Sequence, residues 1–383
     1  MRIDGCLPGG NGLFSIVSTG QSKKPSCLNS GQHRSGVLVK TEDPLTVMSL
    51  DAELPVKTPP TEELWSENYL FALYDNRLNI GMWLHLGTIP TDWHLWEDRV
   101  YMSLPDGGVL SMMAYHATAV DQRPAGSVMK FTCVEPFRRW RIDFDGFAWY
   151  TSEAAMDSGG EPRFRRRLKL ELEVECVSPI WHASDGPDSA GQIEMAGQSW
   201  AKEHYEQLVC ASGEMTLEED SYELSATGWR DHSRGPRGRK SKDPWGGHVI
   251  GGCQFPSGRK FVFSRYWRPD GTVSMGGGMY VDESGLTSAV TVVVAPELRE
   301  LVLRGETLPI HLQWEGGAVA VSMETVASIW IPRERKHIVG RDRYGKLNDM
   351  YVLNWGPVKW GGETGYVYLE RSSHLNKLPS KIG

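Results

Sequence analysis

The chain has 383 residues and a formal net charge of −7, from 41 basic and 48 acidic side chains. This mild acidity argues against a general nucleic-acid-binding protein. Hydrophobic residues at 40% and charged residues at 23% are typical of a soluble globular protein and not of a disordered one. The longest apolar run, 289–295, is too short to cross a bilayer, so we expect no transmembrane segment.

Residues 1–60 are rich in Gly, Ser, Lys and Pro and show little periodicity. They predict an extension that is partly disordered or lies along the surface. No basic stretch followed by a long apolar run occurs in 1–20, so we expect no secretory signal. The six cysteines are scattered without a C-x-x-C pair. This pattern favours free thiols in a reducing compartment and hence a cytoplasmic protein.

From residue 61 onward, short apolar runs alternate with turns. The clearest run is 168–176, in which Leu168, Leu170, Leu172 and Val174 alternate with charged residues. Such alternation is typical of an antiparallel strand with one buried and one wet face. Further runs that predict strands in this half are 68–75, 81–87, 99–104, 109–115 and 139–144.

A second set of strand-like runs extends to residue 371, and no long helical periodicity interrupts it except near 189–207. Many short strands without crossover helices predict an all-β fold of antiparallel sheets. Gly and Pro thin the pattern at 184–201. We therefore expect an N-terminal β domain at 61–190 and a C-terminal β domain at 191–375.

The densest polar cluster is 228–240, which includes Arg230, Asp231, His232 and Arg234. Asp231 and His232 point to opposite faces if the strand continues, so a shared pocket requires a bulge near a glycine. One interpretation is an acid–base group at a barrel mouth, with a pKa set by burial and by the arginines. The alternative is a charged hairpin loop with a structural salt bridge.

Two further features accompany this cluster. His204 and Glu206 belong to a second polar group, HYEQ at 204–207, which could equally be an exposed strand start. The chain also has 15 Trp. Most should lie in the core, although some could line a pocket for a large apolar ligand. Phosphate-loop, dinucleotide, zinc-protease and nucleophile-elbow motifs are all missing from the sequence, and the scattered histidines give no support for a metal site.

Three stretches resemble one known superfamily. These are EHYEQ at 203–207, SGE at 212–214 and GWRDHSRGPR at 228–237, and EPFRRWRI at 135–142 is similar to a strand of its bacterial branch. Together they resemble the AttH-like and hydroxyneurosporene synthase (carotenoid hydratase) superfamily. Arg234 stands where this superfamily commonly has Trp.

The resemblance implies two consecutive lipocalin-like barrels or sandwiches that act without cofactors on large apolar molecules. In that case Asp231 would be the general acid or base, His232 would orient or relay the proton, and Tyr266 would donate a hydrogen bond to an oxygen that gains charge. The residues expected to bind substrate are Trp229, Arg230, Arg234, Trp245, Trp267 and Glu206.

The expected function is therefore a cofactor-independent lyase, isomerase or cyclase for a terpenoid, steroid-like or polyketide-like molecule. Two alternatives remain open at this point. One is a lipocalin-like carrier or sensor that releases its ligand unchanged. The other is a Trp-rich carbohydrate binder or glycosidase, which would need a pair of carboxylates that the sequence does not reveal.

Overall fold

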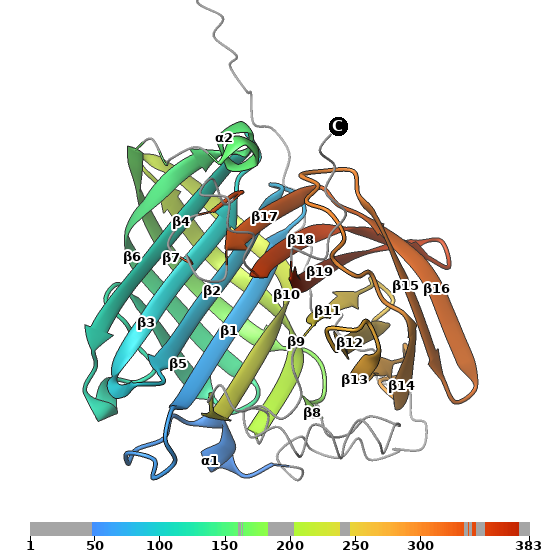
Figure 1. The fold of residues 1–383 in the computed structure, drawn as a ribbon, viewed down its shortest axis with the longest axis horizontal. Coiled ribbons are helices and arrows are strands. Elements are labelled where there is room, and N and C mark those ends of the chain that lie inside the picture. Colours follow the sequence, from blue (N-terminus) through green and yellow to red (C-terminus); the bar gives the residue numbers. More distant parts are fainter. Residues whose placement is uncertain are drawn as a thin grey trace, which may run out of the picture. The chain divides into compact units, whose positions relative to one another are not determined.

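A computed structural model describes residues 48–159, 162, 164–182, 203–237, 246–332, 336, 339–341 and 349–374. The chain divides into two units, Met1–Leu38 and Val39–Gly383, and all described residues belong to the second. This unit consists of two antiparallel sheets (Figure 1). The all-β fold expected from the sequence is confirmed.

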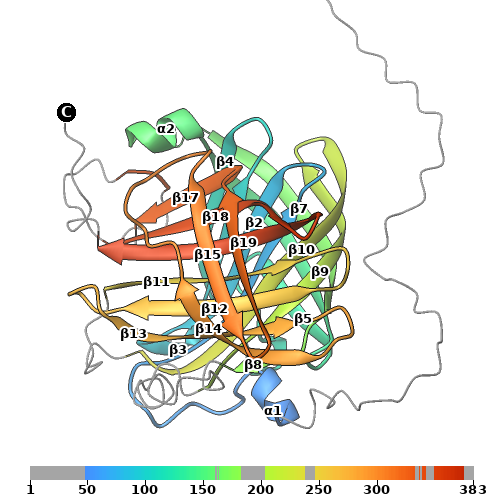
Figure 2. The same cartoon turned by 90° about the vertical axis from the view of Figure 1, so that its right-hand side faces the viewer.

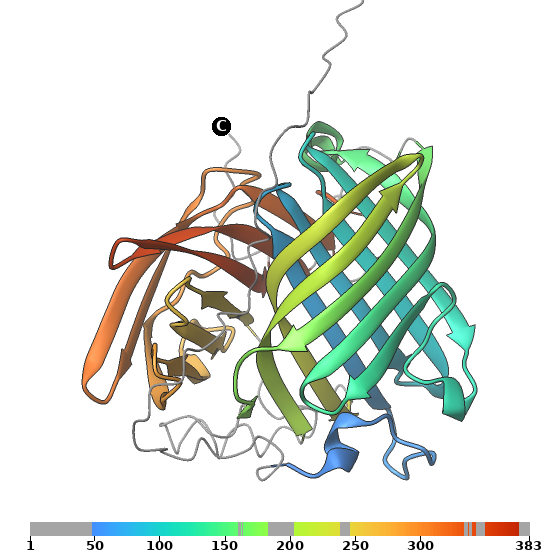
Figure 3. The same ribbon diagram turned by 180° about the vertical axis from the view of Figure 1, so that it is seen from behind.

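The first sheet closes into a barrel because its two outermost long strands pair with each other. The order is β10-β1-β2-β3-β4-β6-β7-β9, and β9 pairs with β10 along its whole length. Figure 3 shows the tilted strands of this barrel from behind. The barrel strands are β1 (Trp65–Asp75), β2 (Ile80–Ile89), β3 (Asp92–Ser103), β4 (Gly108–Ala117), β6 (Arg139–Ser152), β7 (Phe164–Cys176), β9 (Glu203–Leu217) and β10 (Asp220–Pro236), and the short strands β5 (Met129–Glu135) and β8 (Trp181–His182) pair at its margin.

The barrel interior is filled with side chains. On β7, Leu168, Leu170, Leu172 and Val174 are buried while the intervening charged residues are exposed. They join one apolar cluster that lines the inside of the other barrel strands. The alternation seen in the sequence is thus the inside–outside alternation of a barrel wall.

The second sheet forms a ring (Figure 2). A single pairing between Met323 and Val358 joins β16 to β18 and completes it. Its strands are β11 (Gly247–Gln254), β12 (Lys260–Trp267), β13 (Val273–Val281), β14 (Thr287–Val294), β15 (Thr307–Trp314), β16 (Gly317–Glu324), β17 (Ala327–Pro332), β18 (Asp349–Trp360) and β19 (Glu363–His374).

The two sheets divide between Pro236 and Gly247, not near residue 190 where the sequence places the seam. β9 and β10 complete the first barrel because β9 pairs with β7 and β10 pairs with β1. The strand pattern at 203–236 shows that these strands exist but not which neighbours they take.

Helical segments are few and short in the described part of the chain: α1 (Leu50–Glu53), the 3-10 turn η2 (Val120–Gln122) and α2 (Glu153–Ser158). None of these helices is long and apolar enough to span a membrane. α1 belongs to the expected extension, yet Glu53 is fully buried. The last part of that extension is therefore a packed element, while residues 1–47 lie outside the described residues.

Candidate functional site

The candidate site lies on the outer wall of the barrel, where β9 and β10 face the ring. Glu206 on β9 is the direct cross-strand partner of Asp231 on β10. His204 is two residues before Glu206, so its side chain emerges on the same face. Its Nε2 lies 2.5 Å from Asp231 Oδ2 and 3.6 Å from Glu206 Oε1. Two carboxyl groups therefore share one imidazole.

Glu206 and Asp231 differ in how deeply they are buried. Glu206 is completely buried, and desolvation raises its pKa to about 8 even though His204 opposes the shift; the charge of Asp231 adds to it. Burial alone would lower the pKa of His204, but Asp231 outweighs this and raises it. The Asp231 side chain keeps 13% exposure. Near neutral pH Glu206 is therefore protonated, and it lies beside His204 and Asp231.

The ring contributes a second polar group to the same region. The Trp229 indole N–H donates to Glu206 Oε2 at 2.8 Å. The indole of Trp229 also packs against the phenol ring of Tyr368 on the second sheet, at 5.7 Å between centroids. The Tyr368 hydroxyl donates to Glu370 Oε2 at 3.1 Å. Tyr266 is buried, and desolvation together with the charges of Glu206, Asp231 and Glu370 raises its pKa well above 10. The aromatic contact between Trp229 and Tyr368 therefore joins two hydrogen-bonded groups, Glu206–Trp229 on the barrel and Tyr368–Glu370 on the second sheet.

Aromatic and aliphatic side chains surround this cluster. Trp83, Trp181, Trp229, Trp330 and Trp355 belong to a single apolar cluster drawn from both sheets. The indole N–H groups of Trp181, Trp330 and Trp355 are buried and have no hydrogen-bond partner among the described residues. The surroundings are thus apolar but carry a few donors able to bind an oxygen atom.

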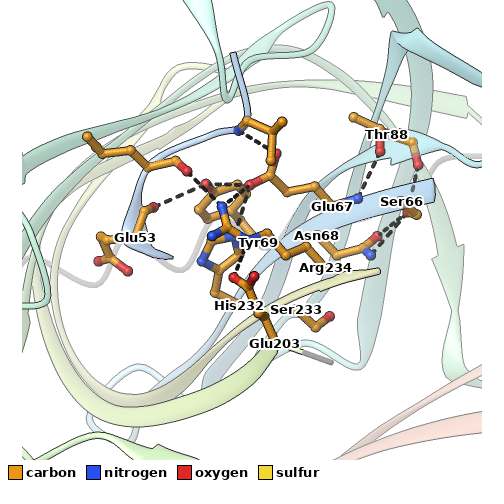
Figure 4. Close-up of polar contacts among 12 residues, drawn as sticks. Glu53, Ser66, Glu67, Asn68, Tyr69, Thr88, Glu203, His232, Ser233 and Arg234 are labelled. Atoms are coloured by element: carbon orange, nitrogen blue, oxygen red, sulfur yellow. Dashed lines mark hydrogen bonds and ion pairs between the residues drawn. The ribbon is translucent and has the colours of Figure 1, made fainter. Parts of the chain in front are cut away.

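His232 lies on the opposite face of β10 from Asp231. The β9–β10 register continues through both residues without a shift, so no bulge brings them together. His232 points into the barrel, where its Nδ1 lies 2.9 Å from the Tyr205 hydroxyl and its Nε2 3.2 Å from Glu67 Oε1. Its ring stacks on Tyr69 at 3.9 Å (Figure 4). The proton partner of Asp231 in this structure is His204.

Arg230 also points into the barrel and is neutralised there by Glu53. Its two terminal nitrogens donate to the Glu53 carboxylate at 2.8 and 2.7 Å, and the Trp140 indole N–H donates to the same group at 2.8 Å. Burial raises the pKa of Glu53, but Arg230 outweighs burial and the net shift is downward. This ion pair fixes α1 across the end of the barrel.

The other residues expected to bind substrate are dispersed. Arg234 contacts Glu203 and Glu67 at the barrel end (Figure 4). Trp267 faces away from Tyr266 and packs inside the ring. Trp245 lies outside the described residues. Of the expected site residues, the structure brings together Asp231, Glu206, Trp229 and Tyr266.

His204, Glu206 and Asp231 are also the one group among the described residues whose donor atoms, all within 4.8 Å of one another, could suit a metal ion. The 2.5 Å separation of His204 Nε2 and Asp231 Oδ2 is a hydrogen-bond distance. It is shorter than the separation of two ligands that each lie about 2.0–2.2 Å from a zinc ion in a tetrahedral site. The geometry fits a shared proton better than a shared cation.

Two features of the site were not evident from the sequence. His204 is a central member and not an exposed strand start, and its H-x-E spacing with Glu206 is the signal that places both on one face. Glu206 and Asp231 form the carboxylate pair that the sequence did not reveal, because strand pairing joins residues 25 positions apart. A groove of about 680 Å³ on β15, β16 and β18 contains none of these residues.

The comparisons with known proteins agree with this architecture. Residues 51–375 match the family described as "Domain of unknown function (DUF7064)", and the chain belongs to that family. No protein of curated function matches the chain.

Several solved structures are similar to the chain at low identity. A protein described as an AttH from Nitrosomonas europaea is 12% identical with a TM-score of 0.50, covering 81% of this chain and 92% of its own. CghA, also solved with Sch210972, is 8% identical with a TM-score of 0.49, covering 82% and 89%. Kievitone hydratase from Nectria haematococca is 11% identical with a TM-score of 0.42, covering 80% and 88%. The expected resemblance to AttH is confirmed for the fold.

Proposed function

We propose that this member of the DUF7064 family is a cofactor-independent lyase, isomerase or cyclase that transfers protons to and from a large apolar molecule. The observation that carries the proposal is the buried group of Glu206, His204 and Asp231, in which the protonated carboxyl group of Glu206 lies beside His204 and Asp231. A carboxyl group whose pKa burial raises toward neutrality is typical of a general acid.

Each member of this group has a distinct role. The protonated Glu206 delivers a proton to a double bond or carbonyl oxygen, and the Asp231 carboxylate removes a proton from another atom of the substrate or from water. His204 Nε2 faces both carboxyl groups and carries a proton from one to the other. The Tyr266 hydroxyl, which remains protonated, donates a hydrogen bond to an oxygen that gains charge.

The surroundings suggest the substrate class. Five tryptophans and several aliphatic side chains of both sheets suit a large hydrophobic skeleton of terpenoid, steroid-like or polyketide-like type. The buried indole N–H groups of Trp330 and Trp355 suit one or two oxygen atoms on that skeleton. Arg230 is paired with Glu53 inside the barrel, and Arg234 is paired with Glu67 and Glu203 at the barrel end, so neither arginine favours an anionic substrate.

Mass spectrometry of an apolar cell extract, incubated with the pure protein in deuterated, heavy-oxygen water, tests this proposal. A product that gains labelled water identifies a hydratase, and deuterium without oxygen identifies an isomerase or cyclase. Asp231→Asn should slow the labelling by about 10²–10⁴-fold. An unchanged rate in this variant would remove Asp231 from the mechanism.

The second candidate is a lipocalin-like carrier or sensor of a hydrophobic molecule. It is favoured by the same apolar cluster between the sheets. A compound that is retained by the wild type and by Asp231→Asn, but altered by neither, would support this candidate and contradict the enzyme. For either function we propose a cytoplasmic location.

A further inference from the structure

A row of four side chains crosses the ring on the face that is turned toward the barrel. His248 on β11 pairs with Tyr266 on β12 and with Ser372 on β19, and Ser372 pairs in turn with Tyr351 on β18. Cross-strand partners point to the same face of a sheet. The row Tyr266–His248–Ser372–Tyr351 is therefore fixed by strand register and not by loops.

Within this row, His248 hydrogen-bonds on both sides. Ser372 Oγ lies 2.7 Å from His248 Nδ1, and His248 Nε2 lies 3.1 Å from Glu370 Oε1. A hydroxyl that faces one imidazole nitrogen, with a carboxylate on the other, is the arrangement that activates a serine nucleophile. The triad is recognised by these roles and distances, whatever the fold or chain order.

Glu370 is itself held in place by donors other than His248. The Trp83 indole N–H donates to its Oε2 at 3.2 Å and the Tyr368 hydroxyl at 3.1 Å. When Glu370 Oε1 accepts a hydrogen bond from His248 Nε2–H, His248 Nδ1 is left to accept the proton of Ser372. Ser372, His248 and Glu370 are all at most 8% exposed, so water competes little for these contacts.

Tyr351 adjoins Ser372 in the row on the side away from His248, and its ring lies 5.9 Å from the His248 ring between centroids. The proton transfers proposed for Glu206 and Asp231 require none of Ser372, His248 and Glu370.

We propose that Ser372, His248 and Glu370 form a nucleophilic triad that cleaves carboxylic esters of apolar acids or alcohols. Ser372 Oγ bonds to the ester carbonyl carbon while its proton passes to His248 Nδ1, and Glu370 stabilises the imidazolium. The C–O bond of the ester then breaks, and the leaving alcohol takes the proton from His248. Water repeats the sequence on the acyl-serine, releases the acid and restores Ser372.

Diisopropyl fluorophosphate tests the triad without knowledge of the natural substrate. The full-length wild-type protein is incubated with this small probe, and the adduct is counted by intact mass and located by peptide mass spectrometry. We expect one adduct, on Ser372. Absence of an adduct under conditions that fully label a serine protease, or an adduct on another residue, would overturn the proposal.

Variants separate the triad from simple reactivity and from the proton-transfer function. Ser372→Ala should abolish labelling, and His248→Asn should slow it at least about 100-fold. Ser264→Ala, which removes an equally buried serine of β12, should label like the wild type. Asp231→Asn should also label like the wild type, so loss of the proton-transfer activity leaves this test intact. Labelling of His248→Asn at the wild-type rate would refute the triad.

Discussion

Replacing Glu206 by Gln tests whether this buried carboxyl group is neutral in the folded protein. The unfolded chain releases the proton of Glu206 near pH 4.5, whereas the folded protein holds it up to about pH 8. Between these values the folded state binds one more proton than the unfolded state. The free energy of unfolding therefore falls by about 1.4 kcal/mol for each pH unit as pH rises.

The whole interval corresponds to about 5 kcal/mol, which is stability present below pH 4.5 and lost once pH has passed about 8. Gln is neutral at every pH and has no such loss. The two proteins should be similarly stable at pH 5, and Glu206→Gln should be more stable at pH 9 by up to about 5 kcal/mol.

Urea unfolding of both proteins at pH 5, 7 and 9 measures this difference without any substrate. Glu214→Gln, at an exposed position on the same strand, serves as the control and should follow the wild type at each pH. A constant difference between Glu206→Gln and the wild type across these pH values would show that Glu206 is ionised like an ordinary carboxylate. The assignment of Glu206 as the acid would then fail.

Three further substitutions test the surrounding framework. Glu53→Gln leaves a buried guanidinium without its ion-pair partner and should lower the free energy of unfolding by about 3–5 kcal/mol in urea, while the exposed Asp51→Asn should have no effect. His232→Gln should destabilise the barrel by about 1–3 kcal/mol yet leave deuterium incorporation into substrate unchanged, because its side chain lies inside the barrel. Gly81→Ala places a methyl group 2.6 Å from the Trp355 ring, and thermal unfolding should show a loss of about 1–3 kcal/mol.

Part of the candidate site could be read from residue spacing. Asp231 and His232 are adjacent on an uninterrupted strand, so their opposite orientations follow from the strand period of two residues. The same period places His204 and Glu206 together. What spacing does not show is that Glu206 faces Asp231, because that pairing depends on the register of β9 against β10.

Residue spacing does not predict the contacts of Glu53 and Trp83, which reach their hydrogen-bond partners from distant parts of the chain. Glu53 reaches Arg230 across 177 positions, and Trp83 reaches Glu370 across 287. No local signal in the sequence distinguishes these residues from surface acids or core aromatics. Their roles arise when the barrel closes and the ring packs against it.

The fold class of this protein follows from local patterns along the chain, which predict antiparallel strands with alternating faces and a polar motif that resembles AttH. Alternation of apolar and polar residues is a local property, so it is readable from the chain. Only the folded structure shows that β10 closes the first barrel against β1, and therefore which face of β10 is turned toward the ring. Closure depends on contacts between distant segments, and those contacts alone turn Asp231 toward the ring and His232 into the barrel.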